Sequence, residues 1–313
     1  MGAPRGYPFA TLPVRFDRNR DRRMTTAHVV LIGAARSGTK ILRDGLAEAM
    51  SIGRVPYDIG YVWRYGHERY PDDTLGAQDS SERTRAFIRG FVNRYALGNP
   101  PSVIEKTVGN VMRLGLVADV FPEARYVHLI RDGVDVIEST WRQWTAPSDI
   151  RYLLRKSRHF PLRLVPSYGQ TYIQSMMHRR GRNGARVGSW GPRYPGIDVD
   201  LAQSDLLAVC ARQWRNSVIF ARRDLVRLQL PVIDIRYQDL VRDPGSELAR
   251  VASFVGLKTS PLALATAARR VTSGHDDMGR RSLSDGELAL VDAEVGELLA
   301  ELGCAPARRA GSP

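Results

Sequence analysis

The stretch His28–Met50 reads HVVLIGAARSGTKILRDGLAEAM, and it decides how the rest of the chain is interpreted. The apolar run after His28 is typical of a buried strand, and the apolar residues after Lys40 recur at helical spacing. Between them lies a loop that contains Gly33 and Gly38. This order gathers backbone N–H groups and the positive end of a helix dipole at one point. The stretch therefore predicts an anion site.

The loop differs from a nucleotide-hydrolysing P-loop in its last two residues. In that motif a lysine on the phosphates precedes a serine or threonine that binds Mg²⁺. Here Thr39 precedes Lys40, so the hydroxyl stands where the lysine belongs and the magnesium hydroxyl is missing. The spacing favours a cradle for phosphate or sulfate, and it argues against magnesium-dependent nucleotide hydrolysis.

The composition is that of a folded protein with an excess of positive charge. Of the 313 residues, 43% are hydrophobic and 25% are charged, which is ordinary for a globular chain with a large core. The formal net charge is +13, and 42 of the 46 basic residues are arginine. An anionic partner is therefore expected, of which a phosphorylated cofactor, an acidic glycan and nucleic acid are the candidates.

Cysteine usage and hydropathy indicate the compartment. Cys210 and Cys304 are too few for a disulfide framework or a metal cluster, which suits a reducing environment. Residues 1–23 contain six arginines and no apolar segment, so no signal peptide is recognised. No run of about 18 apolar residues occurs, so no membrane span is expected. These observations predict a cytoplasmic protein with no metal site.

Strands alternate with helices along most of the chain. Further apolar runs typical of strands lie at 102–104, 125–130 and 231–236. The alternation predicts an α/β fold with a mostly parallel central sheet flanked by helices. Ligands of such sheets bind beyond the carboxyl ends of the strands. The loops that begin at Gly33, Lys106, Arg131 and Tyr237 should therefore converge on one site.

A single domain is predicted over residues 27–303, with a flexible arm at 1–26 and a tail at 304–313. Residues 145–202 interrupt the regular pattern with many Pro, Gly and Arg residues. Within them, residues 145–200 carry ten basic and three acidic side chains, a net charge of +7. We interpret this stretch as an ordered insertion that binds an acceptor, with a solvated surface as the alternative.

Three motifs together resemble the sulfotransferases that use 3′-phosphoadenosine 5′-phosphosulfate (PAPS). GAARSGTKIL, from Gly33, resembles the loop for the 5′-phosphosulfate, and ARYVHLIRDGVDVIEST, from Ala124, resembles the motif for the 3′-phosphate. IRYQDLVRDP, from Ile235, with the later FVGL, is similar to a strand and helix of the family. The C-terminal MGRRSLSDGELALVDAEVGELLAELG is like a stretch of its bacterial and tyrosylprotein branches. The resemblance covers residues 28–302 except 145–202, and it implies a P-loop-like sulfotransferase fold.

The resemblance implies an enzyme that moves the sulfuryl group of PAPS to a hydroxyl or amine of an acceptor by in-line transfer without a metal. The product of the donor is 3′,5′-adenosine bisphosphate (PAP). The loop residues expected to hold the phosphosulfate are Gly33, Ala35, Arg36, Ser37, Gly38, Thr39 and Lys40. Arg131 and Ser139 are expected to hold the 3′-phosphate. Tyr237 is expected either to contact the adenine or to pack in the core, and Arg280 or Arg281 to close over the phosphate.

The same resemblance places Lys106 beside the sulfuryl group. Cations and loop N–H groups there would stabilise the charge that develops on the bridging oxygen. A base must also accept the proton of the acceptor hydroxyl. At the offset from the loop arginine where related branches carry a glutamate, this sequence has Asp58. Glu68 and His67, in the same segment, are the alternatives.

The expected acceptor is a glycan or glycolipid headgroup, because arginines donate paired hydrogen bonds to anionic groups. The alternative enzyme class is an ATP-dependent small-molecule kinase of the P-loop type. The order Thr39-Lys40 argues against a kinase, and so does Arg131, which follows the strand where a metal-binding aspartate would stand. The third hypothesis, a nucleic-acid-binding protein, rests on net charge alone, since no DNA- or RNA-binding motif is found. No nucleic-acid partner is expected.

Overall fold

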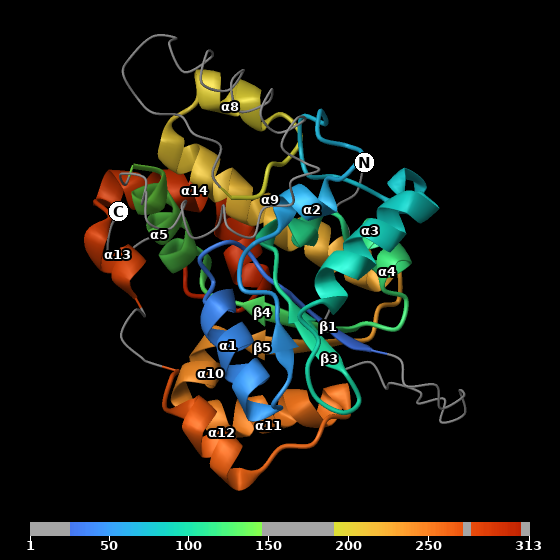
Figure 1. The fold of residues 1–313 in the computed structure, drawn as a ribbon. Coiled ribbons are helices and arrows are strands. Elements are labelled where there is room, and N and C mark those ends of the chain that lie inside the picture. Colours follow the sequence, from blue (N-terminus) through green and yellow to red (C-terminus); the bar gives the residue numbers. More distant parts are fainter. Residues whose placement is uncertain (1–25, 146–190, 272–276, 308–313) are drawn as a thin grey trace.

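The computed structural model describes residues 26–145, 191–271 and 277–307 (Figure 1). Residues 1–25 of the predicted arm at 1–26, residues 146–190 of the predicted insertion at 145–202 and residues 308–313 of the predicted tail lie outside the described residues. Within the described residues, no helix is both long and apolar enough to cross a membrane. The same residues contain no group of His, Cys, Asp and Glu side chains that could hold a metal ion.

The centre of the fold is a five-stranded sheet in the order β2-β3-β1-β4-β5, in which every neighbouring pair is parallel. The strands are β1 (Ala27–Ile32), β2 (Gly53–Arg54), β3 (Ser102–Glu105), β4 (Arg125–Ile130) and β5 (Val232–Arg236). β1 is the middle strand, and its last four residues are fully buried because helices cover both of its faces. The predicted α/β fold with a parallel central sheet is confirmed.

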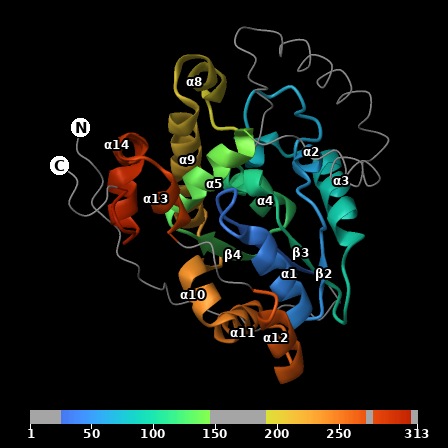
Figure 2. The ribbon, with the colours of Figure 1, turned by 90° about the vertical axis from the view of Figure 1, so that its left-hand side faces the viewer.

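The helices form layers on the two faces of this sheet. They are α1 (Thr39–Ala49), α2 (Gly60–Trp63), α3 (Glu82–Asn93), α4 (Leu114–Val120), α5 (Gly133–Thr145), α8 (Ile197–Gln203), α9 (Leu206–Arg227), α10 (Tyr237–Arg242), α11 (Pro244–Val255), α12 (Pro261–Ala268), α13 (Met278–Ser282) and α14 (Asp285–Glu301), with 3₁₀ turns η1 (Ala77–Asp79) and η2 (Val108–Met112). Figure 1 shows α1, α10, α11 and α12 on one side of the sheet. Figure 2 shows α13 and α14 beside α5 and α9.

Alternate residues of β1 connect the two layers. Val29 and Leu31 belong to an apolar cluster with α1, α10, α11 and α12, whereas Val30 and Ile32 belong to another with α2, α3, α4 and α9. This alternation follows from the two-residue period of a strand. A strand buried on both faces therefore carries apolar residues at every position, as the run after His28 does.

The segment 110–121 does not form one continuous helix, although its apolar residues recur at helical intervals as far as Pro122. It forms the end of η2 and then α4, with a break at Arg113, whose φ is −136°. The Asn110 amide donates to the carboxylate of Glu105 at 2.9 Å, and the Arg113 guanidinium donates to Asp73 at 2.6 Å. These side-chain bonds hold the turn against the edge of the sheet, so the regular helix begins only after it.

Candidate active site

The loop between β1 and α1 has a backbone shaped to hold an anion. Arg36 and Gly38 adopt the left-handed conformation, with φ of 68° and 93°. A Cβ on Gly33 would lie 2.7 Å from the carbonyl oxygen of Leu129, so only glycine lets the loop pass this close to β4. Among the described residues, no side chain caps α1, and its first turn has no acidic residue. The N–H groups of this helix end are therefore available to a phosphate or sulfate.

The predicted loop residues divide into buried and exposed side chains. Ala35, Ser37 and Thr39 are at most 6% exposed, whereas Arg36 and Lys40 are exposed. The buried side chains fix the shape of the loop from within. Positive charge at the surface of the loop comes from the two exposed cations.

A cluster of positive charge forms where the loop meets α5. The Arg36 Nε donates to the Ser139 Oγ at 3.0 Å, and an Arg131 Nη donates to the carbonyl oxygen of Arg36 at 3.4 Å. Although Arg36 is exposed as a whole residue, partial desolvation of its guanidinium where it meets α5 lowers the pKa of that group, and the nearby charges of Arg142 and Arg131 lower it further. Like charges this close repel one another, so an anion bound among them would stabilise the cluster. The structure thus brings Arg131 and Ser139 together and adds the side chain of Arg36, which the sequence placed with the phosphosulfate.

The ring of Tyr237 lies beside this cluster. It is 2% exposed, and the guanidinium of Arg131 lies 4.2 Å from its centroid in a cation–π contact. A Cβ on Gly38 would lie 2.7 Å from the ring, so Tyr237 also packs against the loop. Tyr237 is therefore a packing residue between the loop and Arg131 in this structure. Its contact with adenine stays a prediction.

Helix α13 is fastened to the start of α5 by two aspartates that follow Arg131. The two terminal nitrogens of Arg280 donate to the Asp132 carboxylate at 2.9 and 3.0 Å. The Asp135 carboxylate accepts two backbone N–H groups at the start of α13 and lies 3.6 Å from Arg131. Arg280 is thus engaged by Asp132, whereas Arg281 is exposed. Closure of either arginine over a phosphate stays a prediction.

Lys106 and Asp58 form an ion pair at the carboxyl end of β3. The Lys106 Nζ donates to the two Asp58 oxygens at 2.8 and 3.1 Å, and the backbone N–H of Val108 donates to Asp58 at 2.9 Å. The Lys106 side chain is 8% exposed, whereas that of Asp58 is 34% exposed, so solvent reaches the carboxylate. The pair places a positive charge next to a proton acceptor at the sheet edge from which the loop also starts.

His67 and Glu68, the other candidate bases, are bonded within their own segment. The His67 Nε2 lies 2.6 Å from the carbonyl oxygen of Asp79, and Glu68 accepts the backbone N–H of Gly66 at 3.1 Å. In the described part of the chain, Asp58 is the one candidate base that contacts Lys106. The geometry favours Asp58, and the assignment of the base stays a prediction.

Glu105 is a buried acid beside this pair that the sequence reasoning missed. It is 2% exposed and accepts hydrogen bonds from the Trp63 indole at 3.3 Å, the Thr107 hydroxyl at 2.5 Å and the Asn110 amide at 2.9 Å. Burial raises the pKa of its carboxyl to about 7. The sequence contained a signal for this residue, because the end of an apolar strand is an unusual position for an acidic side chain. Here that side chain also stands directly before Lys106.

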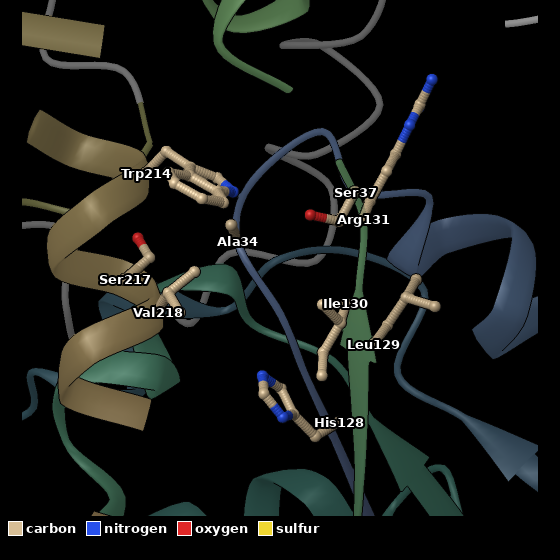
Figure 3. A pocket seen from close by; sticks show the side chains of 9 residues that line it. All are labelled: Ala34, Ser37, His128, Leu129, Ile130, Arg131, Trp214, Ser217 and Val218. Atoms are coloured by element: carbon tan, nitrogen blue, oxygen red, sulfur yellow. The ribbon is translucent and has the colours of Figure 1, made fainter. Parts of the chain in front are cut away.

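A small cavity lies behind the loop, between β4 and α9 (Figure 3). Its walls include Ser37, His128, Arg131 and Trp214. It has room for about one water molecule, so it is too small for a nucleotide. The cavity is therefore part of the support behind the loop and not the place of a cofactor.

Comparison with known proteins assigns the chain to a family. A family model described as the sulfotransferase family matches residues 28–187, which is 160 of the 313 residues. This chain belongs to the sulfotransferase family. The family expected from the loop, strand and helix motifs is thereby confirmed. A search of the curated proteins finds no match.

Solved structures resemble this sulfotransferase at low sequence identity. Sulfotransferase STF9 from Mycobacterium avium is 12% identical, with 91% of this chain and 79% of that one covered and a TM-score of 0.51. A sulfotransferase from Alicyclobacillus acidocaldarius is 14% identical, with 90% and 97% covered and a TM-score of 0.43. Mouse sulfotransferase SULT7A1, complexed with PAP, is 11% identical, with 90% of each chain covered and a TM-score of 0.45. The first of these likenesses supports the fold.

The contact between Arg280 and Asp132 predicts a stability effect in this sulfotransferase. Their side chains are 14% and 10% exposed, so Arg280→Ala leaves a largely buried carboxylate without its two-bond partner. We expect this change to lower the free energy of unfolding by about 2 kcal/mol, measured by urea denaturation. Arg281→Ala is the matched control, since an exposed neighbour should cost less than about 0.5 kcal/mol. Equal losses for the two variants would contradict the role of Arg280.

Glu105 predicts a pH dependence of stability. Its pKa is about 7 in the folded chain, and a carboxyl in the unfolded chain has a pKa of roughly 4. Between these values the folded state binds a proton that the unfolded state has lost, so this group makes stability fall as the pH rises from about 4 to about 7. We expect Glu105→Gln to reduce that fall by on the order of 1–3 kcal/mol, measured by denaturation across this range. Parallel pH profiles for the two proteins would show that Glu105 is not the group responsible.

Proposed function

We propose that this sulfotransferase uses PAPS as its donor and transfers the sulfuryl group to a hydroxyl or amine of an acceptor, releasing PAP. The observation that carries the proposal is the position of the Lys106–Asp58 pair at the same sheet edge as the anion loop. Transfer from a donor with two phosphate-bearing ends requires two anion sites and a proton acceptor. The loop, the cluster around Arg131 and the Asp58 carboxylate provide these three parts.

The residues fit a donor that carries charge at both ends. The N–H groups at the start of α1, with Lys40 nearby, would hold the 5′-phosphosulfate. Arg131, Arg36 and Ser139 would hold the 3′-phosphate, because a guanidinium donates two parallel hydrogen bonds to a phosphate. This division also accounts for a loop without the magnesium-binding hydroxyl of a nucleotide hydrolase.

PAPS held by the loop and the cluster around Arg131 would supply the sulfuryl group: the acceptor atom would bond to its sulfur, and the bond from sulfur to the phosphate oxygen would break to release PAP. Asp58 accepts the proton that the acceptor loses, so the acceptor atom becomes nucleophilic as the new bond forms. Lys106 stabilises negative charge on the departing oxygen. An ammonium has three N–H donors, so Lys106 can hold Asp58 and still donate to another oxygen.

We assign the acceptor to glycans or glycolipid headgroups on the charge of residues 145–200. Most of these residues lie outside the described chain, but Arg193 lies in the described part. The backbone N–H of Asp73 donates to the Arg193 carbonyl at 2.8 Å, and the Arg193 N–H donates to the Asp73 carboxylate at 2.9 Å. These two bonds support placing the end of the insertion next to the segment that follows Asp58. In this proposal the acceptor enters the site there.

A transfer assay tests this proposal. The purified protein is incubated in EDTA with ³⁵S-labelled PAPS and fractionated glycans, glycolipids and small metabolites. We expect label to move to a carbohydrate-containing fraction with wild type and not with Lys106→Ala. Transfer from labelled ATP that depends on Mg²⁺, with none from PAPS, would indicate the kinase alternative instead. Label only in small uncharged phenols would retain the sulfotransferase proposal and reject the acceptor class.

A further inference from the structure

Behind the Lys106–Asp58 pair lies a buried hydrogen-bond chain that none of the roles above uses. We propose that the Thr107 hydroxyl, oriented by Glu105, is a positioning residue that holds Asp58 in place for proton transfer. The inference rests on the proposed function, in which Asp58 is the base. Asp58 follows β2, and Thr107 follows β3, the neighbouring strand. The inference therefore adds a support for the base that comes from the end of the adjacent strand.

The chain runs from β3 to the turn that carries Asp58. The Thr107 hydroxyl donates to the Glu105 Oε1 at 2.5 Å, and the backbone N–H of Ile59 donates to the Thr107 Oγ1 at 3.0 Å. The backbone N–H of Val108 then donates to the Asp58 carboxylate at 2.9 Å. Two successive residues, Thr107 and Val108, thus form hydrogen bonds with two successive residues of the facing turn, Ile59 and Asp58.

The direction of the Thr107 hydroxyl is what lets it accept from Ile59. A hydroxyl has one hydrogen and two lone pairs, and donating the hydrogen to one partner turns a lone pair toward another. Glu105 takes that hydrogen, so the lone pair can accept the Ile59 N–H. Because Ile59 follows Asp58 directly, this bond fixes the peptide from which the Asp58 side chain extends.

Burial makes this hydrogen-bond chain rigid and keeps it apart from the reacting groups. Glu105, Thr107 and Ile59 are each 2% exposed, whereas Asp58 has a third of its side chain exposed. Glu105 is also held by Trp63 from α2 and by Asn110 from η2. A buried carboxyl group that accepts three hydrogen bonds has little freedom to move, so it can orient a hydroxyl but cannot reach an acceptor.

Thr107→Val and Thr107→Ser form the matched pair for the test. Valine keeps the shape of threonine and removes the hydroxyl, whereas serine keeps the hydroxyl. With the most active acceptor fraction of the transfer assay, we expect Thr107→Val to lower kcat at least about tenfold and Thr107→Ser to restore most of it. The Kd for PAP should stay within about twofold in both variants, since, among the described residues, the hydrogen bonds of Thr107 join Glu105 and Ile59 and not the cluster around Arg131. Thr107→Ala provides a second hydroxyl deletion if the valine variant does not fold.

The background of Asp58→Asn distinguishes positioning from a general loss of structure. If Thr107 acts through the Asp58 carboxylate, Thr107→Val should lower the residual kcat of Asp58→Asn by less than about twofold. Losses that multiply in the double variant, or a Thr107→Val enzyme with the kcat of wild type, would overturn the inference. Wild type that binds no PAP and transfers no label would instead overturn the proposed function.

Discussion

Asp58→Asn is expected to lower turnover by about a hundredfold or more while leaving the affinity for PAP nearly unchanged. Asparagine has the shape of aspartate and can still accept the N–H of Val108, but it cannot take a proton from the acceptor. It also removes the charge that pairs with Lys106. Initial rates with labelled PAPS give kcat, and calorimetric titration with PAP gives the affinity.

Glu68→Gln is the control for this result, because Glu68 lies in the same segment and is bonded to its own turn. We expect it to change kcat by less than about threefold. If Glu68→Gln shows the large loss and Asp58→Asn does not, the base is Glu68. The same comparison with His67→Asn covers the remaining alternative.

Arg131→Ala is expected to weaken PAP binding at least about tenfold, which is more than 1 kcal/mol. The change removes a guanidinium from a cluster in which Arg36 and Ser139 are already joined. It also removes the contact with Tyr237, so stability falls as well and affinity alone is an incomplete readout. The discriminating quantity is the ratio of affinities for PAP and for 5′-AMP, which lacks the 3′-phosphate.

Wild type should prefer PAP over 5′-AMP, and Arg131→Ala should lose most of that preference. Arg131→Lys keeps the charge without the planar fork, so it should retain only part of the preference. A preference that is the same in wild type and in Arg131→Ala would show that the 3′-phosphate binds elsewhere.

The fold was predictable from local patterns. The run after His28, the glycine loop and the helical spacing after Lys40 each constrain a few neighbouring residues, and the structure has β1, the loop and α1 there. The parallel sheet follows from the alternation of strands and helices. Once the sheet is parallel, the residues at the strand ends share one edge, so Lys106 and Arg131 were predicted as site residues without knowing any distance.

The pairings within the site were less predictable, because they join residues far apart in the chain. Arg36 meets Ser139 across 103 residues, and Arg280 meets Asp132 across 148. The spacing of residues along the chain does not determine which rotamer a long side chain such as arginine adopts at such a contact. Arg36 was assigned to the phosphosulfate by its place in the loop, and in the structure its side chain donates to Ser139 in α5. Its contact with the phosphosulfate stays a prediction.

Calorimetric titration of the wild-type protein with PAP in EDTA tests the central claim most directly, since it needs no knowledge of the acceptor. We predict that PAP binds without Mg²⁺ and at least about tenfold more tightly than 5′-AMP, because two anion sites each contribute charge-assisted hydrogen bonds. ATP with Mg²⁺ should bind more weakly than PAP. No binding of PAP in EDTA, together with tight binding of ATP that requires Mg²⁺, would contradict the account.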